Sequence, residues 1–295
     1  MKILIIKLGL SETLDAEIGH VISLGDVLRT TPILHALREI YPTGKITWLA
    51  EERARLLLDD TSLIDRLLIW DSFVGFQLLA EKFDVVINLE KVAGLCALAN
   101  SINAWKKYGF RFDEISGSYH AFEGAEYAME LCALEDTKKN NNKVWQQVLI
   151  EMVGCKWQNQ PYVLDYIPKN TPCFDVGFNY QVGTKFPEKA WEHSKWEELE
   201  NLLIQDNQTV SWQEGLSNLY EYMEWITSCK ILVSCDSLGL HIALAFGIPV
   251  IGLFGPTNSK EIFFYGSSRV IQKNYMKDIN SKEVLKKILE VQNRL

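Results

Sequence analysis

SLGDVLRTTP, at residues 23–32, is the stretch of this chain that decides its fold. It follows Lys2-Ile3-Leu4-Ile5-Ile6-Lys7, an apolar segment typical of a buried strand. It leads into residues 33–41, where apolar side chains recur at helical spacing. A buried strand, a turn with a glycine and an acid at the start of a helix together predict the opening of a nucleotide-type α/β domain.

A second stretch, DSLGLH at residues 236–241, opens a later helix after another strand-like segment. The free amides and the positive dipole end of a helix start suit an anion. The two stretches together predict a cleft between two α/β domains, with an acid on one wall and an anion site on the other.

The composition is that of a soluble globular protein with room for two domains. The chain has 295 residues, of which 47% are hydrophobic and 23% are charged. Its apolar runs are shorter than the ~18 residues that span a bilayer, and its start lacks the apolar core of a signal peptide. We therefore expect a cytoplasmic protein without a transmembrane segment.

Charge and motif content argue against several classes of function. The formal net charge of −8 disfavours a nucleic-acid-binding face, which needs a basic excess. The six cysteines form no Cys-x-x-Cys pair and the five histidines are scattered, so a zinc site has little support. The sequence also lacks the Gly-x-Gly-x-x-Gly of a dinucleotide oxidoreductase and the Gly-Lys-Ser/Thr of a P-loop kinase.

Strand-like and helix-like segments alternate along both halves, which predicts parallel sheets covered by helices. The expected strands are residues 3–6, 45–49, 66–69, 84–89, 175–179, 230–234 and 249–254. The expected helices are residues 33–41, 51–58, 74–82, 143–153, 194–204, 238–246 and 281–295. The stretch DYIPKNTP at residues 165–172 breaks both periods. It predicts domains at 1–168 and 169–295, and the last helix could pack back on the first domain.

Two long motifs resemble a known family. SLGDVLRTTPILHALREIYP and DSLGLHIALAFGIPVIGLFGPT are similar to the two signature regions of glycosyltransferase family nine, the bacterial heptosyltransferases. A shorter match, Lys189-Ala190-Trp191 followed by Trp196, resembles the Lys-x-Trp element that opens the first helix of that family's second domain. The similarity runs from residue 1 to about residue 266 and covers most of the chain.

The resemblance implies a GT-B fold, in which two facing Rossmann-like domains with parallel sheets hold the active site. It implies an acceptor domain at 1–168 and a nucleotide-sugar donor domain at 169–295. It also implies inverting, metal-independent transfer of a heptose from ADP-heptose, without a further cofactor. The acceptor would be a lipopolysaccharide core-like glycan or a protein, and the enzyme could make peripheral contact with the inner membrane.

The chain departs from the family pattern at three places. Residues 10–22 form an acidic insertion before SLGD, where the family has a tight turn. The glycine of the second motif is displaced by one position, to Gly239. The chain runs directly from residues 205–208 to residues 209–212, where the family usually has an additional strand and helix near the nucleotide base.

Sugar transfer with inversion needs a base that takes the proton of the acceptor hydroxyl. Asp26 fits this role, because it lies at a strand-to-helix turn, and Ser23 and Gly25 would line the acceptor side of the cleft. The alternative is that Asp26 only stabilises the start of its helix. The family resemblance favours the base.

The leaving diphosphate needs positive charge or dipoles. Lys189 is the best candidate for a point charge, with Thr184 and Lys185 just upstream. The helix start would supply amides, the Ser237 hydroxyl and His241, while Asp236 would hold the turn or a sugar hydroxyl. The donor-binding set is therefore Thr184, Lys185, Lys189, Glu214, Asp236, Ser237, Leu238, Gly239 and His241, with Gln213 beside Glu214 at the ribose. The alternatives are purely structural roles: a helix cap for Ser237, a core histidine for His241 and a solvated surface lysine for Lys189.

Two other functions remain open. The altered base-recognition region is compatible with a GT-B transferase that uses a different nucleotide sugar. The chain could also be a sugar-nucleotide-binding protein without catalysis, although the retained Gly25-Asp26 pair, Lys189 and residues 236–241 argue against that loss. The turn Gly255-Pro256-Thr257 after an expected strand is either a loop facing the donor or a plain connection.

Overall fold

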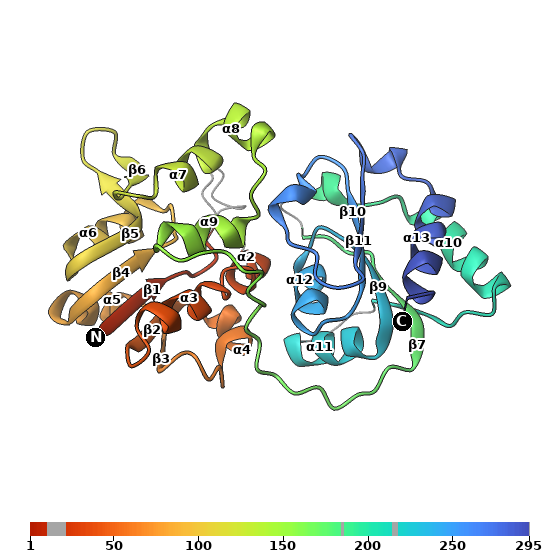
Figure 1. Ribbon diagram of the computed structural model, residues 1–295, viewed down its shortest axis with the longest axis horizontal. Coiled ribbons are helices and arrows are strands. Elements are labelled where there is room, and N and C mark those ends of the chain that lie inside the picture. Colours follow the sequence, from red (N-terminus) through yellow and green to blue (C-terminus); the bar gives the residue numbers. More distant parts are fainter. Residues whose placement is uncertain (11–21, 184–185, 214–217, 295) are drawn as a thin grey trace. The chain divides into compact units, whose positions relative to one another are not determined.

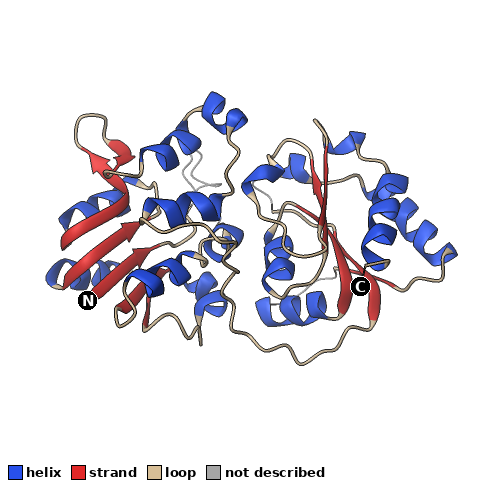
Figure 2. Ribbon diagram, in the orientation of Figure 1, coloured by secondary structure: helices blue, strands red, loops and turns tan. Residues whose placement is uncertain are grey.

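The computed structural model describes residues 1–10, 22–183, 186–213 and 218–294 (Figure 1). The chain divides into two compact units, Met1–Tyr166 and Ile167–Leu295. Each unit is a sheet with helices on both of its faces (Figure 2). Among the described residues, no helix has both the length and the apolar character that crossing a membrane would require.

The first unit has a six-stranded sheet in the order β3-β2-β1-β4-β5-β6. Its strands are β1 Lys2–Ile6, β2 Lys45–Ala50, β3 Arg66–Ile69, β4 Lys82–Asn88, β5 Asn103–Asp113 and β6 Ser118–Ala121. The first five pair in parallel, and β6 turns back antiparallel to β5. Its helices are α2 Leu24–Leu28, α3 Ile33–Ile40, η1 Glu52–Ala54, α4 Arg55–Leu58, α5 Ser72–Ala80, α6 Ala93–Ser101, α7 Glu126–Ala133, α8 Glu135–Asn140 and α9 Trp145–Met152.

Strand β1 lies at the centre of this sheet because it is apolar on both faces. Four of its five residues are buried, which is typical of a parallel strand covered by helices on either side. It pairs with β2 through Ile5 and Trp48 and with β4 through Ile3 and Val85. The direction of strand order reverses between β1 and β4, which is where open α/β sheets place their ligands.

The second unit has a five-stranded parallel sheet in the order β11-β10-β9-β7-β8. Its strands are β7 Phe174–Asn179, β8 Val210–Trp212, β9 Cys229–Cys235, β10 Val250–Phe254 and β11 Arg269–Gln272. Its helices are η2 Pro187–Lys189, α10 His193–Gln205, α11 Leu219–Thr227, α12 Leu238–Ala245, η3 Ser259–Glu261, η4 Met276–Asp278 and α13 Ser281–Gln292. Here the strand order reverses between β7 and β9.

The core of the second unit includes the last helix. Phe178 of β7 packs against Trp196 of α10, with ring centroids 5.0 Å apart. Val284, Ile288 and Val291 of α13 are fully buried in the same cluster. The apolar face of α13 is therefore used within its own unit.

The segment that joins the two units is anchored at both ends by carboxylates. In the first unit, Asp165 Oδ2 accepts the Ser62 amide at 2.7 Å. In the second, the Glu224 carboxylate accepts the amides of Lys169 and Asn170, each at 2.9 Å. Each end of the connection is thus bound to the unit it enters.

Candidate active site

The second sheet brings several predicted residues together at its carboxyl edge. Strand β7 ends at Asn179, and β9 is followed by Asp236 and Ser237, so the two ends meet where the strand order reverses. The Asn179 side-chain amide donates to Ser234 Oγ at 2.7 Å and to Ser237 Oγ at 2.8 Å. Ligands of open α/β sheets bind at such a point.

Lys189 and Asp236 form an ion pair beside this point. Lys189 Nζ lies 2.7 Å from Asp236 Oδ2, and the two side chains are only 18% and 16% exposed. The ammonium also lies 4.9 Å from the ring centroid of Phe186. Asp236 therefore holds Lys189 in place, a role that we did not predict for it. Lys189 is not the solvated surface lysine of the alternative interpretation, because its side chain is mostly buried.

Ser237 is the N-cap residue of α12, with extended backbone at φ −149° and ψ 176°. Among the described residues, its side chain makes no capping hydrogen bond to the helix. It is instead held by Asn179, so the cap alternative does not describe its hydroxyl. Leu238 and Gly239 follow in the first turn, and His241, further along α12, is only 4% exposed.

Two loops at the same sheet edge carry buried polar atoms. Gln213 Oε1, just after β8, and Thr257 Oγ1, after β10, are inaccessible to solvent and have no hydrogen-bond partner within the described ranges. Buried polar atoms without a partner are uncommon in native proteins. Their placement at the carboxyl ends of two further strands fits groups that a polar ligand would satisfy.

Three donor-side predictions fall outside the described residues. These are Thr184, Lys185 and Glu214. Residues 11–21, which make up most of the acidic insertion, also lie outside them.

In the first unit, Asp26 lies in the first turn of α2. Its Oδ1 is 2.9 Å from Arg29 Nε, and its side chain is 38% exposed. The Arg29 guanidinium in turn lies 5.6 Å from the ring centroid of Trp145. The carboxylate is thus accessible and is oriented by a cation three residues on. Sequence reasoning did not identify this arginine.

The insertion leaves the start of α2 joined closely to the end of β1. The Ser23 amide donates to the Gly9 carbonyl at 2.8 Å, so the two ends of the insertion meet. Gly9 has φ +87°, a conformation that favours glycine. A Cβ there would lie 2.9 Å from both the Ser23 carbonyl and the Val27 side chain. Gly25 lies in the first turn of α2, beside Asp26.

Glu90 holds this connection from the neighbouring strand. Its side chain is buried, and its Oε1 accepts the amides of Leu8 and Gly9, each at 2.7 Å. Lys7 Nζ lies 3.2 Å from the same oxygen. A buried acid with three such partners fixes the strand-to-helix turn at the reversal of strand order. The sequence signal that we overlooked is a single acid directly after the apolar strand β4.

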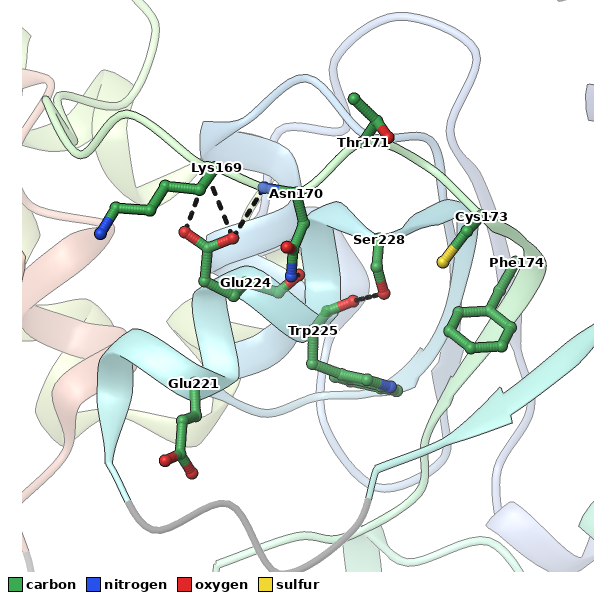
Figure 3. A pocket seen from close by; sticks show the side chains of 9 residues that line it. All are labelled: Lys169, Asn170, Thr171, Cys173, Phe174, Glu221, Glu224, Trp225 and Ser228. Carbon is green, nitrogen blue, oxygen red and sulfur yellow. Dashed lines mark hydrogen bonds between the residues drawn. The ribbon is translucent and has the colours of Figure 1, made fainter.

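The second unit also contains a pocket of about 640 Å³ at the opposite end of its sheet (Figure 3). Figure 3 shows Cys173 and Phe174 at the start of β7, Ser228 just before β9 and the Trp225 side chain of α11 around it. This end of the strands lies away from Asp236 and Ser237, which follow the end of β9. The pocket is thus separate from the residues predicted to bind the donor.

The described residues contain no group of three or more histidine, cysteine, aspartate or glutamate side chains that could hold a metal ion. Within the described residues, the candidate site contains Lys189, a helix start and hydroxyl and amide groups. Such groups can bind a diphosphate through charge and hydrogen bonds.

The two α/β units, each with a sheet in which the strand order reverses, have the architecture of the two-domain GT-B fold. The model of glycosyltransferase family 9 (heptosyltransferase) matches residues 215–289. Lipopolysaccharide heptosyltransferase 1 of Escherichia coli (strain K12) is 23% identical to this chain, over 90% of the chain and 96% of that protein.

Two solved structures share the fold over the full chain. E. coli heptosyltransferase WaaC with ADP has a TM-score of 0.69 at 20% identity, covering 99% of this chain and 100% of that one. E. coli ADP-heptose LPS heptosyltransferase II has a TM-score of 0.71 at 18% identity, covering 100% of both chains. The family model and the curated relative confirm the predicted resemblance to glycosyltransferase family 9 and support the predicted enzyme class, a glycosyltransferase. The two solved structures confirm the predicted fold class.

Proposed function

We propose that this enzyme transfers a heptose from ADP-heptose to a glycan or protein acceptor, with inversion at the anomeric carbon and without a metal. The observation that carries the proposal is the Lys189–Asp236 pair next to Ser237, at the strand-order reversal of the second sheet. Here a held cation, a helix start and a hydroxyl meet at the carboxyl edge of the sheet. The curated relative and the two structural neighbours are named for heptose transfer.

In this proposal the domain at 169–295 binds the donor. Lys189, Ser237 and the amides of Leu238 and Gly239 bind the diphosphate, and they stabilise the negative charge that builds up as it leaves. Asp236 keeps the lysine in position and offsets its charge before the donor arrives. We assign Gln213 and Glu214 to the ribose, and Thr184, Lys185, His241 and Thr257 to the rest of the donor site. Of these, Thr184, Lys185 and Glu214 lie outside the described residues.

The domain at 1–168 binds the acceptor beside Ser23 and Gly25. Asp26 takes the proton from the acceptor hydroxyl while that oxygen forms a bond to the anomeric carbon. The bond from that carbon to the diphosphate breaks on the opposite face, and ADP leaves with the electron pair. Arg29 orients the Asp26 carboxylate without covering it, which suits a base that must reach a bound sugar. We place the reaction in the cytoplasm.

Nucleotide selectivity tests the proposal and separates it from a GT-B transferase with another donor. Titration calorimetry with ADP, UDP and GDP should give ADP the lowest Kd by at least tenfold. Incubation with ADP-heptose and a lipopolysaccharide core acceptor should then release ADP, equally well with EDTA and with magnesium. A preference for UDP or GDP would refute the donor assignment. Binding without turnover across glycan and protein acceptors would favour the non-catalytic alternative.

A further inference from the structure

The displaced glycine of the second motif has a local cause. Gly239 is buried in the first turn of α12, and a Cβ on it would lie 2.2 Å from the hydroxyl oxygen of Tyr222. The same Cβ would lie 2.6 Å from the side-chain nitrogen of Asn179. Real Cβ contacts are not found at such distances, so any other residue would push Asn179 or Tyr222 away.

Tyr222 and Asn179 form a closed hydrogen-bond network under the helix start. The Tyr222 hydroxyl, carried by α11, donates to Asn179 Oδ1 at 2.5 Å. The two hydrogens of the Asn179 amide are used on Ser234 and Ser237, at 2.7 and 2.8 Å. Both hydrogens and the oxygen of the Asn179 side-chain amide are therefore hydrogen-bonded, which fixes its rotamer.

The network connects a buried end to an accessible end. Asn179 and Ser234 are fully buried and Tyr222 is nearly so, whereas Ser237 is half-buried. Burial raises the pKa of Tyr222, so its hydroxyl remains a neutral donor at physiological pH. Its hydroxyl is also within hydrogen-bonding reach of Ser237 and of the Gly239 amide. Two groups at the start of α12, the Ser237 hydroxyl and the Gly239 amide, are thus contacted by the side chains of Asn179 and Tyr222.

We propose that Asn179 and Tyr222 are positioning residues for the donor diphosphate, and that their contact with the helix start is what requires glycine at position 239. This inference rests on the proposed function, because it assigns the diphosphate to Ser237 and the first turn of α12. Asn179 orients the Ser237 hydroxyl, and Tyr222 locks Asn179 and lies against Gly239. The site is then formed before the donor arrives, which lowers the free-energy cost of ordering it on binding.

Tyr222→Phe tests the pair without changing the shape of the core. It removes one hydrogen bond to Asn179, so Kd for ADP and KM for the donor should rise about tenfold, the equivalent of ~1.4 kcal/mol. Turnover number and acceptor KM should stay within twofold, a split that a purely structural role would not produce. Tyr220→Phe on the same helix is the matched control, since Tyr220 is 46% exposed, and it should leave all four constants unchanged.

Rescue in a double variant tests the link to position 239. Gly239→Ala should weaken ADP binding by more than tenfold, because the new methyl group displaces the network. Gly239→Ala combined with Tyr222→Phe removes the 2.2 Å contact, so it should bind ADP more tightly than Gly239→Ala alone. Melting temperature measured on the same samples shows that each variant is folded.

The outcomes separate this inference from the function on which it rests. A double variant that binds ADP more weakly than Gly239→Ala overturns the inference, as does Tyr222→Phe with the affinity of the parent. In both cases the parent still binds ADP, and the proposed function stands. A parent that binds no ADP overturns the proposed function and this inference together.

Discussion

Asp26→Asn is the change that best distinguishes a catalytic base from a residue that only stabilises its helix. Asparagine keeps the size of the side chain and removes the carboxylate that would accept the acceptor proton. General-base catalysis contributes on the order of a hundredfold to ten-thousandfold in rate. At about 1.36 kcal/mol for each factor of ten, this is ~2.7 to 5.4 kcal/mol of activation free energy.

The structure sets a much smaller limit on what the same change does to stability. The pair between Asp26 Oδ1 and Arg29 Nε is 2.9 Å long but partly exposed, with Asp26 38% accessible. Exposed pairs of this kind contribute ~0.2 to 1 kcal/mol to the free energy of unfolding. For a unit of this size, 1 kcal/mol shifts the melting temperature by about 2 to 4 °C. The two effects therefore differ by several kcal/mol and can be measured on one sample.

The assay is the initial rate of ADP release, with ADP affinity and melting temperature measured in parallel. We expect Asp26→Asn to lose a hundredfold or more in turnover while Kd for ADP stays within twofold. Glu52→Gln is the matched control, because Glu52 pairs with Arg55 at the same spacing and the same 2.9 Å distance. A normal rate in Asp26→Asn, with normal stability, would show that Asp26 is not the base.

Three further changes test other parts of the argument. Lys189→Ala should weaken ADP binding, measured by calorimetry, by ~1.5 to 3 kcal/mol, the scale of a charge-assisted hydrogen bond. The control is Lys230→Ala, which breaks an ion pair with Asp175 and should leave ADP binding unchanged. Hydrogen bonds from Lys230 and Thr209 lower the pKa of Asp175 from 3.8 to about 2, so its stabilisation is present above pH ~4 and is lost as the pH falls toward 2. Between pH ~4 and 2, Asp175→Asn should therefore lose ~1 to 2 kcal/mol less free energy of unfolding than the parent does. The same acid-induced loss in both proteins would contradict the assignment. Gly9→Ala should lower the free energy of unfolding by at least ~1 to 2 kcal/mol in urea titrations, because φ is +87° there, and a parent-like midpoint would count against a required glycine.

The central strands were predictable because burial on both faces leaves a plain apolar signature. The expected strand at residues 3–6 is β1, and the one at residues 66–69 is β3 with the same bounds. The structure differs at residues 51–58, where η1 precedes α4 in place of one helix. There the Glu51 side chain accepts the Arg53 amide at 2.7 Å and starts a tighter turn.

Elements that are short or rich in polar residues were missed for the opposite reason. Strand β5 reads NAWKKYGFRFD, and its exposed half carries lysines and a tryptophan rather than an apolar run. Strand β8 has three residues and lies at the edge of its sheet. Helix α11 is rich in aromatic and acidic residues, with Tyr222 facing a strand end that lies 43 residues earlier in the chain.

The site was predictable as residue types but not as contacts. The motifs placed Lys189, Asp236 and Ser237 on the donor side, and the structure brings these residues to one sheet edge. The ion pair between Lys189 and Asp236 joins residues 47 positions apart, and no local pattern encodes it. The same holds for Asn179, whose importance depends on strand order rather than on its sequence neighbours.

The two carboxylate anchors of the connecting segment have a consequence for the freedom of the chain. With Asp165 tied to one unit and Lys169 to the other, only residues 166–168 lie between the anchors. Pro168 has a fixed φ, and the residue before a proline avoids the helical region, so few soft torsions remain. A short, stiff linker of this kind gives each unit a high effective concentration with respect to the other. The anchors are Asp165 and Glu224, two acids outside the residues that we propose for the acceptor and donor sites.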